Sequence, residues 1–331
     1  MHKVIYAIPI LTKINEVRRT ILTFSIKYIY NVVKFISRSQ KMFDHIAFPI
    51  PYQTLQLPQP VQLTIKRLDL IHPQISGNKF FKLKYNLLAA QQQGFSQVLT
   101  FGGAFSNHIA ATAFAAQHFG FQSIGMIRGE ELASQQFNPT LQTAQDLGMQ
   151  LHFLSRFEYR LRHQAEYLQQ LQQQYPQAFI IPEGGSNALA IQGTQEILSP
   201  DDLENYDVIC CAVGTGGTLA GIIESSSEQQ HVLGFSALKG DFLKHDIQQW
   251  TDKSNWSLTD AYCCGGYAKI TPKLLHFMQQ FEQQHHIPLE QVYTAKMMMG
   301  LLDLIQHHHF SAHTRILAIH TGGLQGKLKT Y

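Results

Sequence analysis

The sequence predicts an α/β protein in which parallel sheets are covered by helices. Short apolar strands alternate with helical segments along the chain, glycines mark most of the transitions, and no internal repeat is present. Such alternation is typical of parallel sheets, because each connection between parallel strands needs a crossover that is usually a helix. A length of 331 residues suggests about two domains.

The predicted elements begin with an extended entry and strand over residues 58–71 and a turn at Gly77-Asn78. Helical spacing over residues 80–93 ends at Gly94, a residue typical of helix C-termini. The elements that follow are a strand at 98–101, a helix at 107–119 stopped by Gly120, a strand at 121–128, a helix opened by Pro139 and ended by Gly148, strands at 179–181, 208–213, 232–235 and 316–319, and helices after Ser186 and Thr218.

Charge is distributed unevenly along the chain. Residues 1–41 contain eight Lys or Arg and one Glu, a charge of +7, while the remainder contains 18 basic and 22 acidic residues, a charge of −4. A body without a basic excess cannot neutralise many phosphates along a duplex. Nucleic-acid binding by the body is therefore not predicted.

The basic N-terminal extension, residues 1–41, contains an amphipathic helical pattern over residues 20–38. Lys27 and Lys34 interrupt its apolar run, which makes it a poor membrane span. Three interpretations stay open: a membrane-surface or transit-like segment, a helix that docks on the body or on a partner, and an appendage with Met42 as an alternative start.

Cysteines and histidines indicate neither a disulfide framework nor a metal site. The four cysteines form two adjacent pairs, Cys210-Cys211 and Cys263-Cys264, and no CxxC motif is present. This usage favours a reducing, cytoplasmic setting, with Cys210 and Cys211 as core thiols. The histidine runs 285–286 and 307–309 are interpreted as solvated helix ends, because neighbouring residues on a helix point to different faces.

A glycine-threonine stretch follows the apolar strand at 208–213 and opens a helix: Gly214-Thr215-Gly216-Gly217-Thr218. Exposed N–H groups at a helix N-terminus bind anions, and the threonines add hydroxyl donors. The stretch matches neither the Walker motif nor the dinucleotide-binding fingerprint. It is interpreted as a phosphate cradle, with a purely structural turn as the alternative.

Two further motifs are candidates for chemistry. Lys79 follows the Gly77-Asn78 turn in apolar surroundings, where desolvation favours the neutral amine that Schiff-base chemistry needs. Ser106 and Asn107 follow a strand and two glycines at a helix start, where exposed N–H groups could hold a substrate carboxylate. Taken alone, Lys79 is interpreted as a surface lysine, and Ser106 and Asn107 are interpreted as helix caps.

Together, the motifs resemble the pyridoxal-phosphate enzymes of the tryptophan-synthase-β-like fold, and most closely the D-cysteine desulfhydrase and 1-aminocyclopropane-1-carboxylate deaminase branch. The resemblance covers residues 58–324. It includes the asparagine-lysine turn, the Ser-Asn pair 27 positions after the lysine, and the cradle at 214–218. Three more segments contribute: Gly184 to Leu189 (GGSNAL), Val292 to Lys296 (VYTAK) and His320 to Gly323 (HTGG).

This resemblance implies two open, twisted, mostly parallel sheets with helices on both faces, the fold type II of pyridoxal-phosphate enzymes. It implies a large cofactor-binding domain of residues 42–81 plus 183–331, a small α/β domain of residues 82–182, and a cofactor between them. A homodimer is also implied. The chain departs from the family pattern at Lys66-Arg67-Leu68-Asp69, at Phe80-Phe81 and around Tyr267.

The resemblance also assigns roles to residues. Lys79 carries pyridoxal 5'-phosphate and, once freed, acts as a general base. The catalytic set also contains Ser106, Tyr293 and Tyr267, and no metal is expected. The cofactor-binding set comprises Lys79, Asn78, Lys82, Asn107, Gly214, Thr215, Gly216, Gly217, Thr218 and Thr294, and the substrate-binding set comprises Ser106, Asn107 and His108.

Thr294 matches the residue that faces the pyridine nitrogen, where the deaminase branch tends to have a glutamate. A hydroxyl offers no charge to hold a proton on that nitrogen, so the ring is a weaker electron sink. Such a sink is sufficient for α,β-elimination with a good leaving group, and D-cysteine desulfhydrase is therefore predicted. The alternatives are 1-aminocyclopropane-1-carboxylate deaminase, a desulfhydrase or dehydratase for another D- or L-amino acid, and a non-catalytic protein that binds a phosphorylated ligand.

Overall fold

The computed structural model describes residues 42–328. The helix predicted over residues 20–38 lies outside the described residues. The chain divides after Ile46 into two units, and both sheets belong to the second unit, from Ala47 onward. In the first unit, a short turn is closed by a hydrogen bond from the Ile46 N–H to the Phe43 carbonyl, with N and O 3.1 Å apart.

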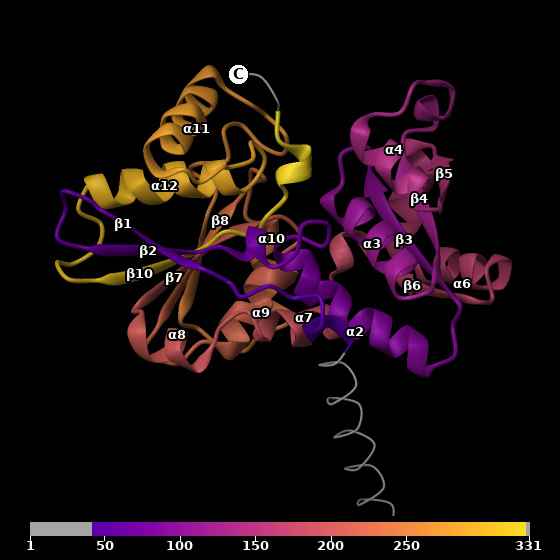
Figure 1. The fold of residues 1–331 in the computed structure, drawn as a ribbon, viewed down its shortest axis with the longest axis horizontal. Coiled ribbons are helices and arrows are strands. Elements are labelled where there is room, and N and C mark those ends of the chain that lie inside the picture. Colours follow the sequence, from indigo (N-terminus) through magenta and orange to yellow (C-terminus); the bar gives the residue numbers. More distant parts are fainter. Residues whose placement is uncertain (1–41, 329–331) are drawn as a thin grey trace, which may run out of the picture. The chain divides into compact units, whose positions relative to one another are not determined.

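A six-stranded sheet has the order β1-β2-β10-β7-β8-β9 (Figure 1). Its first pair is antiparallel and all other neighbours are parallel, which agrees with a mostly parallel sheet. The strands are β1 (Tyr52–Leu55), β2 (Gln62–Lys66), β7 (Val208–Val213), β8 (His231–Ser236), β9 (Trp256–Thr259) and β10 (Arg315–Ile319).

Helices cover both faces of this sheet. On one face, α11 (Pro272–His285) and α12 (Thr294–Gln306) bury side chains against alternate residues of the strands, such as Cys210 and Ala212. On the other face, α9 (Gly217–Ser225) packs on β7 and β8 (Figure 1). The sequence of a strand that is buried on both faces is a continuous apolar run. Residues 208–213 therefore carry no polar side chain other than thiols.

A four-stranded sheet, wholly parallel, has the order β5-β4-β3-β6. Its strands are β3 (Gln97–Gly103), β4 (Gln122–Arg128), β5 (Met149–Leu154) and β6 (Ala178–Ile181). One face packs on α3 (Asn107–His118) and α4 (Pro139–Asp146) through a core that includes Ile109 and Leu141. The other face packs on α5 (Arg156–Arg160) and α6 (Ala165–Gln174) through Tyr159 and Leu171.

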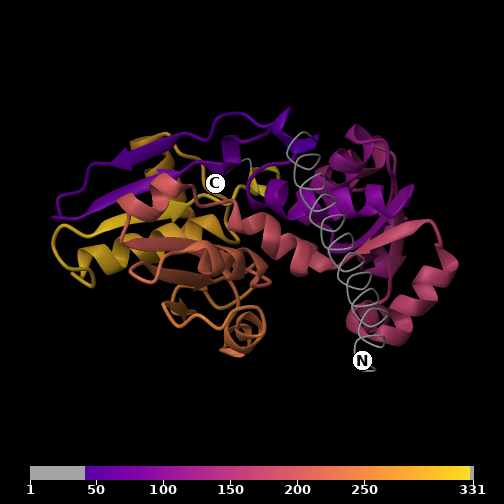
Figure 2. The same cartoon turned by 90° about the horizontal axis from the view of Figure 1, so that it is seen from below.

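Helices α2 (Asn78–Gln92) and α7 (Ala188–Gln195) lie between the two sheets in both ribbon views (Figure 1 and Figure 2). Helix α2 packs on α7, and α7 packs on α9. Two short helices, α8 (Pro200–Asn205) and α10 (Phe242–Gln248), complete the second unit, with 3-10 turns at Leu68–Leu70, Glu130–Ser134, Leu161–His163, Glu183–Gly185 and Leu324–Gly326.

The predicted fold class is confirmed, and most predicted elements match within two residues. The helix at 80–93 is α2, which begins at Asn78 and is followed by Gly94 in a left-handed conformation. The strand predicted within 58–71 is shorter, because the backbone leaves the sheet after Lys66 and makes a 3-10 turn at Leu68–Leu70. Cys210 and Cys211 are fully buried, as expected of core thiols.

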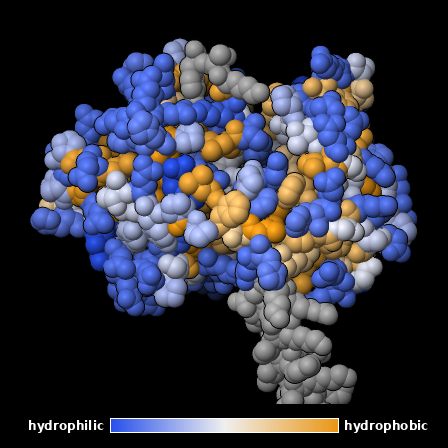
Figure 3. Space-filling model, viewed as in Figure 1, coloured by the Kyte–Doolittle hydropathy of each residue, from blue (hydrophilic) through white to orange (hydrophobic). Residues whose placement is uncertain are grey.

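Hydrophobic side chains gather over the middle of the face shown in Figure 3, and hydrophilic residues cover most of its margins. Within residues 42–328, no helix combines the length and the apolar character that crossing a bilayer requires.

Candidate active site

The candidate residues lie just beyond the carboxyl ends of parallel strands. Gly214 follows β7, His320 follows β10, and Ser106 follows β3 by three residues. Ligands of open α/β sheets bind beyond these strand ends, where the loops from neighbouring strands meet. The topology therefore places three separate motifs of the sequence where a ligand site is expected.

The turn before Lys79 is held against the HTGG segment. Gly77 has φ 66° and ψ −145°, a conformation that L-residues rarely adopt. A Cβ at this position would lie 1.9 Å from the carbonyl oxygen of Thr321, so only glycine fits. The Asn78 N–H donates to the same oxygen, with N and O 3.2 Å apart. This contact places Lys79 in the first turn of α2.

Lys79 presents its amine within this site. Its Nζ donates to Asn78 Oδ1, with the two atoms 3.0 Å apart. Burial lowers the pKa of Lys79 to about 8, while the nearby carboxylate of Glu290 acts in the opposite sense. With this pKa, roughly a tenth of the amine is neutral at pH 7, far more than for an ordinary lysine, and the neutral form is the one that a nucleophilic amine or a general base requires.

We predict that the reactivity of Lys79 follows a titration centred near pH 8. Below that pH the amine is protonated and unreactive, and above it the free amine dominates, because burial disfavours the ammonium form. Competitive acetylation of the apoprotein over a pH series, read by peptide mass spectrometry with exposed Lys273 as internal reference, measures this midpoint. A midpoint at that of the reference lysine would contradict the desolvated environment.

Lys82, one helical turn after Lys79, points its amine at the glycine-threonine stretch. Lys82 is 2% exposed, and its Nζ lies 2.9 Å from both the Gly184 carbonyl oxygen and Ser186 Oγ. No ion pair within residues 42–328 includes Lys82. Burial lowers its pKa well below the ordinary value, and the charge of Lys79 adds to this effect. A bound anion would stabilise the ammonium form.

The stretch 214–218 closes around this amine. Thr215 Oγ1 lies 3.5 Å from Lys82 Nζ, and a Cβ at Gly217 would lie 3.3 Å from the same nitrogen. Thr218 Oγ1 accepts a hydrogen bond from Asn78 Nδ2, with the atoms 2.7 Å apart. Because Gly217 begins α9, the free N–H groups and the dipole of this helix favour an anion here. The structure thus joins two predicted motifs into one cradle of amine, hydroxyl and backbone N–H groups that suits an anion.

Ser106, Asn107 and His108 form the start of α3 but point in different directions. Ser106 Oγ caps the helix by accepting from the Ile109 N–H, with O and N 3.3 Å apart. Asn107 lies beside Gly323, and its Oδ1 is buried with no hydrogen-bond partner among the described residues. The cap explains one role of Ser106, while Asn107 keeps a buried polar atom whose hydrogen-bonding capacity is unused among the described residues.

The His108 side chain turns away from Ser106 into the interior. Thr100 Oγ1 donates to the Ile181 carbonyl, so it accepts from His108 Nε2, with the ring nitrogen and hydroxyl 2.8 Å apart. Nδ1 is then an unprotonated acceptor, and no described residue donates to it. Burial lowers the pKa of His108 well below its ordinary value, so the ring is neutral. The ring lies against Gly185, where an added Cβ would be 3.1 Å from His108 Cε1.

Tyr293 and Tyr267 lie edge to face, with ring centroids 6.2 Å apart and planes inclined by 61°. Tyr293 contacts the cradle at Gly214: a Cβ added at Gly214 would lie 2.9 Å from Tyr293 Cε1. Burial raises the pKa of Tyr293 well above the ordinary value, and its hydroxyl stays protonated. Tyr267 is 49% exposed, so its outer side reaches solvent.

Thr294 is engaged with Glu290, a residue that none of the predicted motifs includes. Glu290 accepts N–H donors from Val292, Tyr293 and Thr294, at 2.7, 2.7 and 2.6 Å from its carboxylate oxygens. Thr294 Oγ1 accepts in turn from the Glu290 N–H at 3.0 Å. Burial raises the pKa of Glu290, and its three N–H donors oppose that shift. Glu290 thereby puts a buried acid at the start of α12, within electrostatic reach of Lys79.

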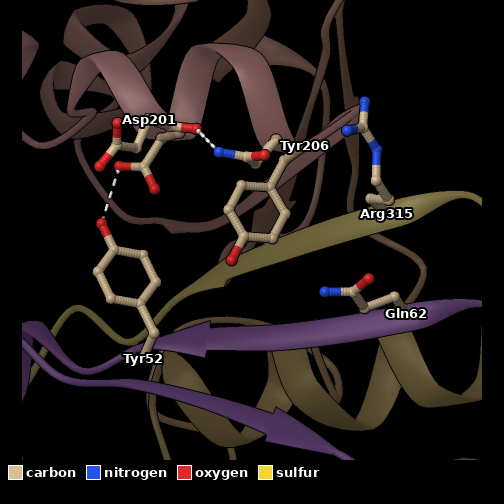
Figure 4. A pocket seen from close by; sticks show the side chains of 7 residues that line it. Tyr52, Gln62, Asp201, Tyr206 and Arg315 are labelled. Atoms are coloured by element: carbon tan, nitrogen blue, oxygen red, sulfur yellow. Dashed lines mark hydrogen bonds between the residues drawn. The ribbon is translucent and has the colours of Figure 1, made fainter.

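A second hollow, outside this site, is bounded by β1, β2, β10 and α8. Figure 4 shows Tyr52 and Arg315 among its lining residues. Two of its three charged lining residues are paired: Asp202 accepts from Tyr52 at 3.1 Å and from Lys66 at 2.5 Å, and Arg315 pairs with Asp207 at 2.6 Å. The third, Asp201, is exposed to solvent. Charges that are already satisfied leave little for a ligand to bind, so we assign this hollow a structural role.

Comparisons with known proteins agree with this geometry. Residues 48–322 match the family described as "Pyridoxal-phosphate dependent enzyme". A bifunctional D-cysteine desulfhydrase/1-aminocyclopropane-1-carboxylate deaminase, mitochondrial, from Arabidopsis thaliana is 31% identical over 312 residues, which cover 85% of this chain and 77% of that protein. A D-cysteine desulfhydrase from Klebsiella pneumoniae is 27% identical over 294 residues, covering 79% of this chain and 87% of the relative.

A solved structure of an ACC deaminase homologue superposes with a TM-score of 0.72 at 26% sequence identity, covering 87% of this chain and 95% of that one. The family match spans most of the chain and includes Lys79, the cradle at 214–218 and the helix start at Ser106. A lysine amine with a lowered pKa beside an anion-binding cradle is the arrangement that a phosphorylated aldehyde requires. The chain belongs to the pyridoxal-phosphate dependent enzymes.

Proposed function

We propose that this enzyme catalyses α,β-elimination on a small amino acid and that its substrate is D-cysteine, which yields pyruvate, ammonia and sulfide. The observation that carries the proposal is that Lys79 and Lys82 lie on one face of α2. The pKa of Lys79 is lowered to about 8, and the amine of Lys82 lies in the cradle at 214–218. The desulfhydrase names of the Arabidopsis and Klebsiella relatives support the choice of reaction.

The residues present fit pyridoxal 5'-phosphate. Lys82, the Gly217 N-terminus of α9 and the hydroxyls of Thr215 and Thr218 suit its phosphate. Lys79 suits its aldehyde, and the unpartnered amide oxygen of Asn107 shows that this side chain has bonding capacity left for a ligand. When bound, the cofactor supplies the electron-withdrawing ring that makes the α-proton of an amino acid acidic.

The other roles follow from positions around Lys79. The neutral Lys79 amine takes the α-proton of the substrate as a general base. At the start of α3, the N–H groups of Asn107 and His108 have no partner within the helix, and with Ser106 they hold the substrate carboxylate. We assign the protonated hydroxyl of Tyr293, together with the hydroxyl of Tyr267, to proton transfer at the leaving group.

Thr294 supports elimination rather than ring opening. Its hydroxyl carries no charge: it accepts from the Glu290 N–H at 3.0 Å and donates to Glu290 oxygens at 3.3 and 3.4 Å. We therefore propose that Thr294 binds the cofactor without fixing a proton on it. The remaining candidate is 1-aminocyclopropane-1-carboxylate deamination to 2-oxobutanoate and ammonia, which the names of the relatives favour equally.

A substrate comparison tests the proposed reaction. We expect purified holoenzyme to release pyruvate and sulfide from D-cysteine much faster than it releases 2-oxobutanoate from the cyclopropane amino acid, because the thiolate is a good leaving group. Keto-acid release identified by chromatography measures both products, and L-cysteine and D-serine test stereochemistry and leaving group. Clear preference for the cyclopropane amino acid would overturn the desulfhydrase assignment.

We also propose a cytoplasmic homodimer. The four cysteines are free thiols, and three of them are buried, which suits a reducing compartment. The dimer rests on the family resemblance, and analytical ultracentrifugation of the holoenzyme measures it directly. We propose no nucleic-acid partner, since the body carries an acidic excess.

A further inference from the structure

The segment that carries Tyr267, residues 263–268, has an unusual backbone. We refer to it as the Tyr267 loop. Four of its residues have positive φ: Cys264 at 55°, Gly265 at 91°, Gly266 at 122° and Ala268 at 55°. Left-handed backbone is unfavourable for Cys264 and Ala268 and persists only where the surroundings impose it. A hydrogen bond inside the loop, from the Gly266 N–H to the Cys263 carbonyl at 3.0 Å, supports this turn together with contacts from outside.

Lys296 contacts the loop from α12. The Lys296 residue is 1% exposed, and its Nζ donates to the carbonyl oxygen of Gly266, with the atoms 2.8 Å apart. None of the ion pairs within residues 42–328 includes Lys296, so this backbone oxygen is its hydrogen-bond partner rather than a carboxylate. Burying a lysine is costly unless its amine has a hydrogen-bond or ion-pair partner, and here the Gly266 carbonyl is that partner.

The contact connects the loop to the candidate active site. Gly266 immediately precedes Tyr267, whose ring lies against Tyr293. Tyr293 immediately precedes α12, the helix that carries Lys296, and stands against Gly214 of the cradle. The bond from Lys296 to Gly266 therefore joins the two segments that bring the tyrosines together. Cys264 at the other end of the loop packs against the core of the six-stranded sheet, so the Lys296 bond is the contact that acts directly beside Tyr267.

We infer that Lys296 is a positioning residue that holds the Tyr267 loop so that Tyr267 meets Tyr293 at the active site. Lys296 takes no part in bond making, and it acts through the Gly266 carbonyl. This inference rests on the proposed function, which places Tyr267 beside the substrate. It predicts that loss of the Lys296 amine disturbs Tyr267 while leaving the lysines of α2 and their cradle in place.

The test uses Lys296→Met in the holoenzyme, because methionine has a similar length and no donor. Lys253→Met is the matched control: Lys253 Nζ also donates to backbone carbonyls, those of Glu224 at 2.8 Å and Ser226 at 2.7 Å, and it lies outside the site. We expect faster hydrogen exchange in peptides covering residues 260–268 for Lys296→Met only. We also expect kcat/KM to fall roughly tenfold to a hundredfold, as for loss of a hydrogen bond from a charged donor.

A double variant separates positioning from general destabilisation. If Lys296 acts through Tyr267, adding Lys296→Met to Tyr267→Phe should cost little further activity, whereas independent effects would multiply. Multiplying effects, or exchange in the loop equal to that of the wild type, would overturn the inference. Should Lys296→Met not fold, Lys296→Gln keeps an amide donor for the Gly266 carbonyl, so its exchange and kcat/KM should stay near those of the wild type. Lys296→Leu, which has no donor, is then judged by the criteria given for methionine.

The exchange measurement also separates this inference from the proposed reaction. If wild-type holoenzyme turned over no amino acid, the proposed function would fail, yet exchange in residues 260–268 would still show whether Lys296 holds the loop. If the enzyme were active and Lys296→Met left both exchange and kcat/KM unchanged, the positioning role alone would be lost.

Discussion

Replacement of Lys79 by alanine is expected to abolish turnover and covalent attachment of the cofactor. Lys79 supplies both the amine that binds the aldehyde and the base that removes the α-proton, so both functions disappear together. General-base catalysis alone is worth about 10²- to 10⁴-fold, so a loss of at least roughly 10³-fold in kcat is expected. Borohydride treatment of wild-type holoenzyme should fix the cofactor on the peptide that contains Lys79, and mass spectrometry should find no such adduct in the variant.

Lys79→Arg is the matched control for charge. Arginine keeps a cation beside Asn78 but has no amine that deprotonates near neutral pH. We expect Lys79→Arg to be as inactive as Lys79→Ala. Substantial activity in Lys79→Arg would show that the position contributes charge rather than a reactive amine. A colourless wild-type protein that binds phosphorylated compounds without turnover would instead favour the non-catalytic alternative.

Much of the fold could be predicted because its signals are local. Gly94, Gly120 and Gly148 all have positive φ and follow the helices that they were predicted to end. The strand at 208–213 was recognisable because burial on both faces requires an unbroken apolar run. These features depend on a few neighbouring residues, and short windows of sequence carry them in full.

Other strands carried no such signal. β9 (Trp256–Thr259) is only partly buried at every position, and polar and apolar residues alternate over β5 (Met149–Leu154) without a clear boundary. Both lie at the edge of a sheet, where one neighbour is missing and burial is incomplete. β1 is also an edge strand, and its antiparallel pairing with β2 depends on tertiary packing rather than on its own four residues.

The candidate site was predicted as separate motifs, but its contacts were not. Lys82 and Ser186 are 104 residues apart, and their hydrogen bond exists only because α2 packs beside the Glu183–Gly185 turn. Glu290 was overlooked because its role needs the three N–H groups at the start of α12. An acid four residues before the first residue of a helix was the available signal. Lys296 lay inside a recognised segment, yet nothing local indicates that Gly266 is its partner.

Substitution of Gly77 by alanine is expected to have the largest effect on folding. The added Cβ would meet the Thr321 carbonyl oxygen at 1.9 Å, and φ 66° disfavours any side chain. Backbone strain and overpacking each cost about 1–3 kcal/mol, so a loss on the order of 4 kcal/mol in the free energy of unfolding is expected. Denaturant unfolding of apoprotein followed by circular dichroism measures this loss.

Gly94→Ala separates the two causes. Gly94 also has positive φ, at 78°, but no atom lies within 4 Å of its added Cβ. We expect Gly94→Ala to lose about 1 kcal/mol from backbone strain alone, with activity preserved. Equal losses in both variants would show that the backbone yields at Thr321. The turn would then not be held rigidly, and the position of Lys79 would have to depend on α2 rather than on the contact between Gly77 and the HTGG segment.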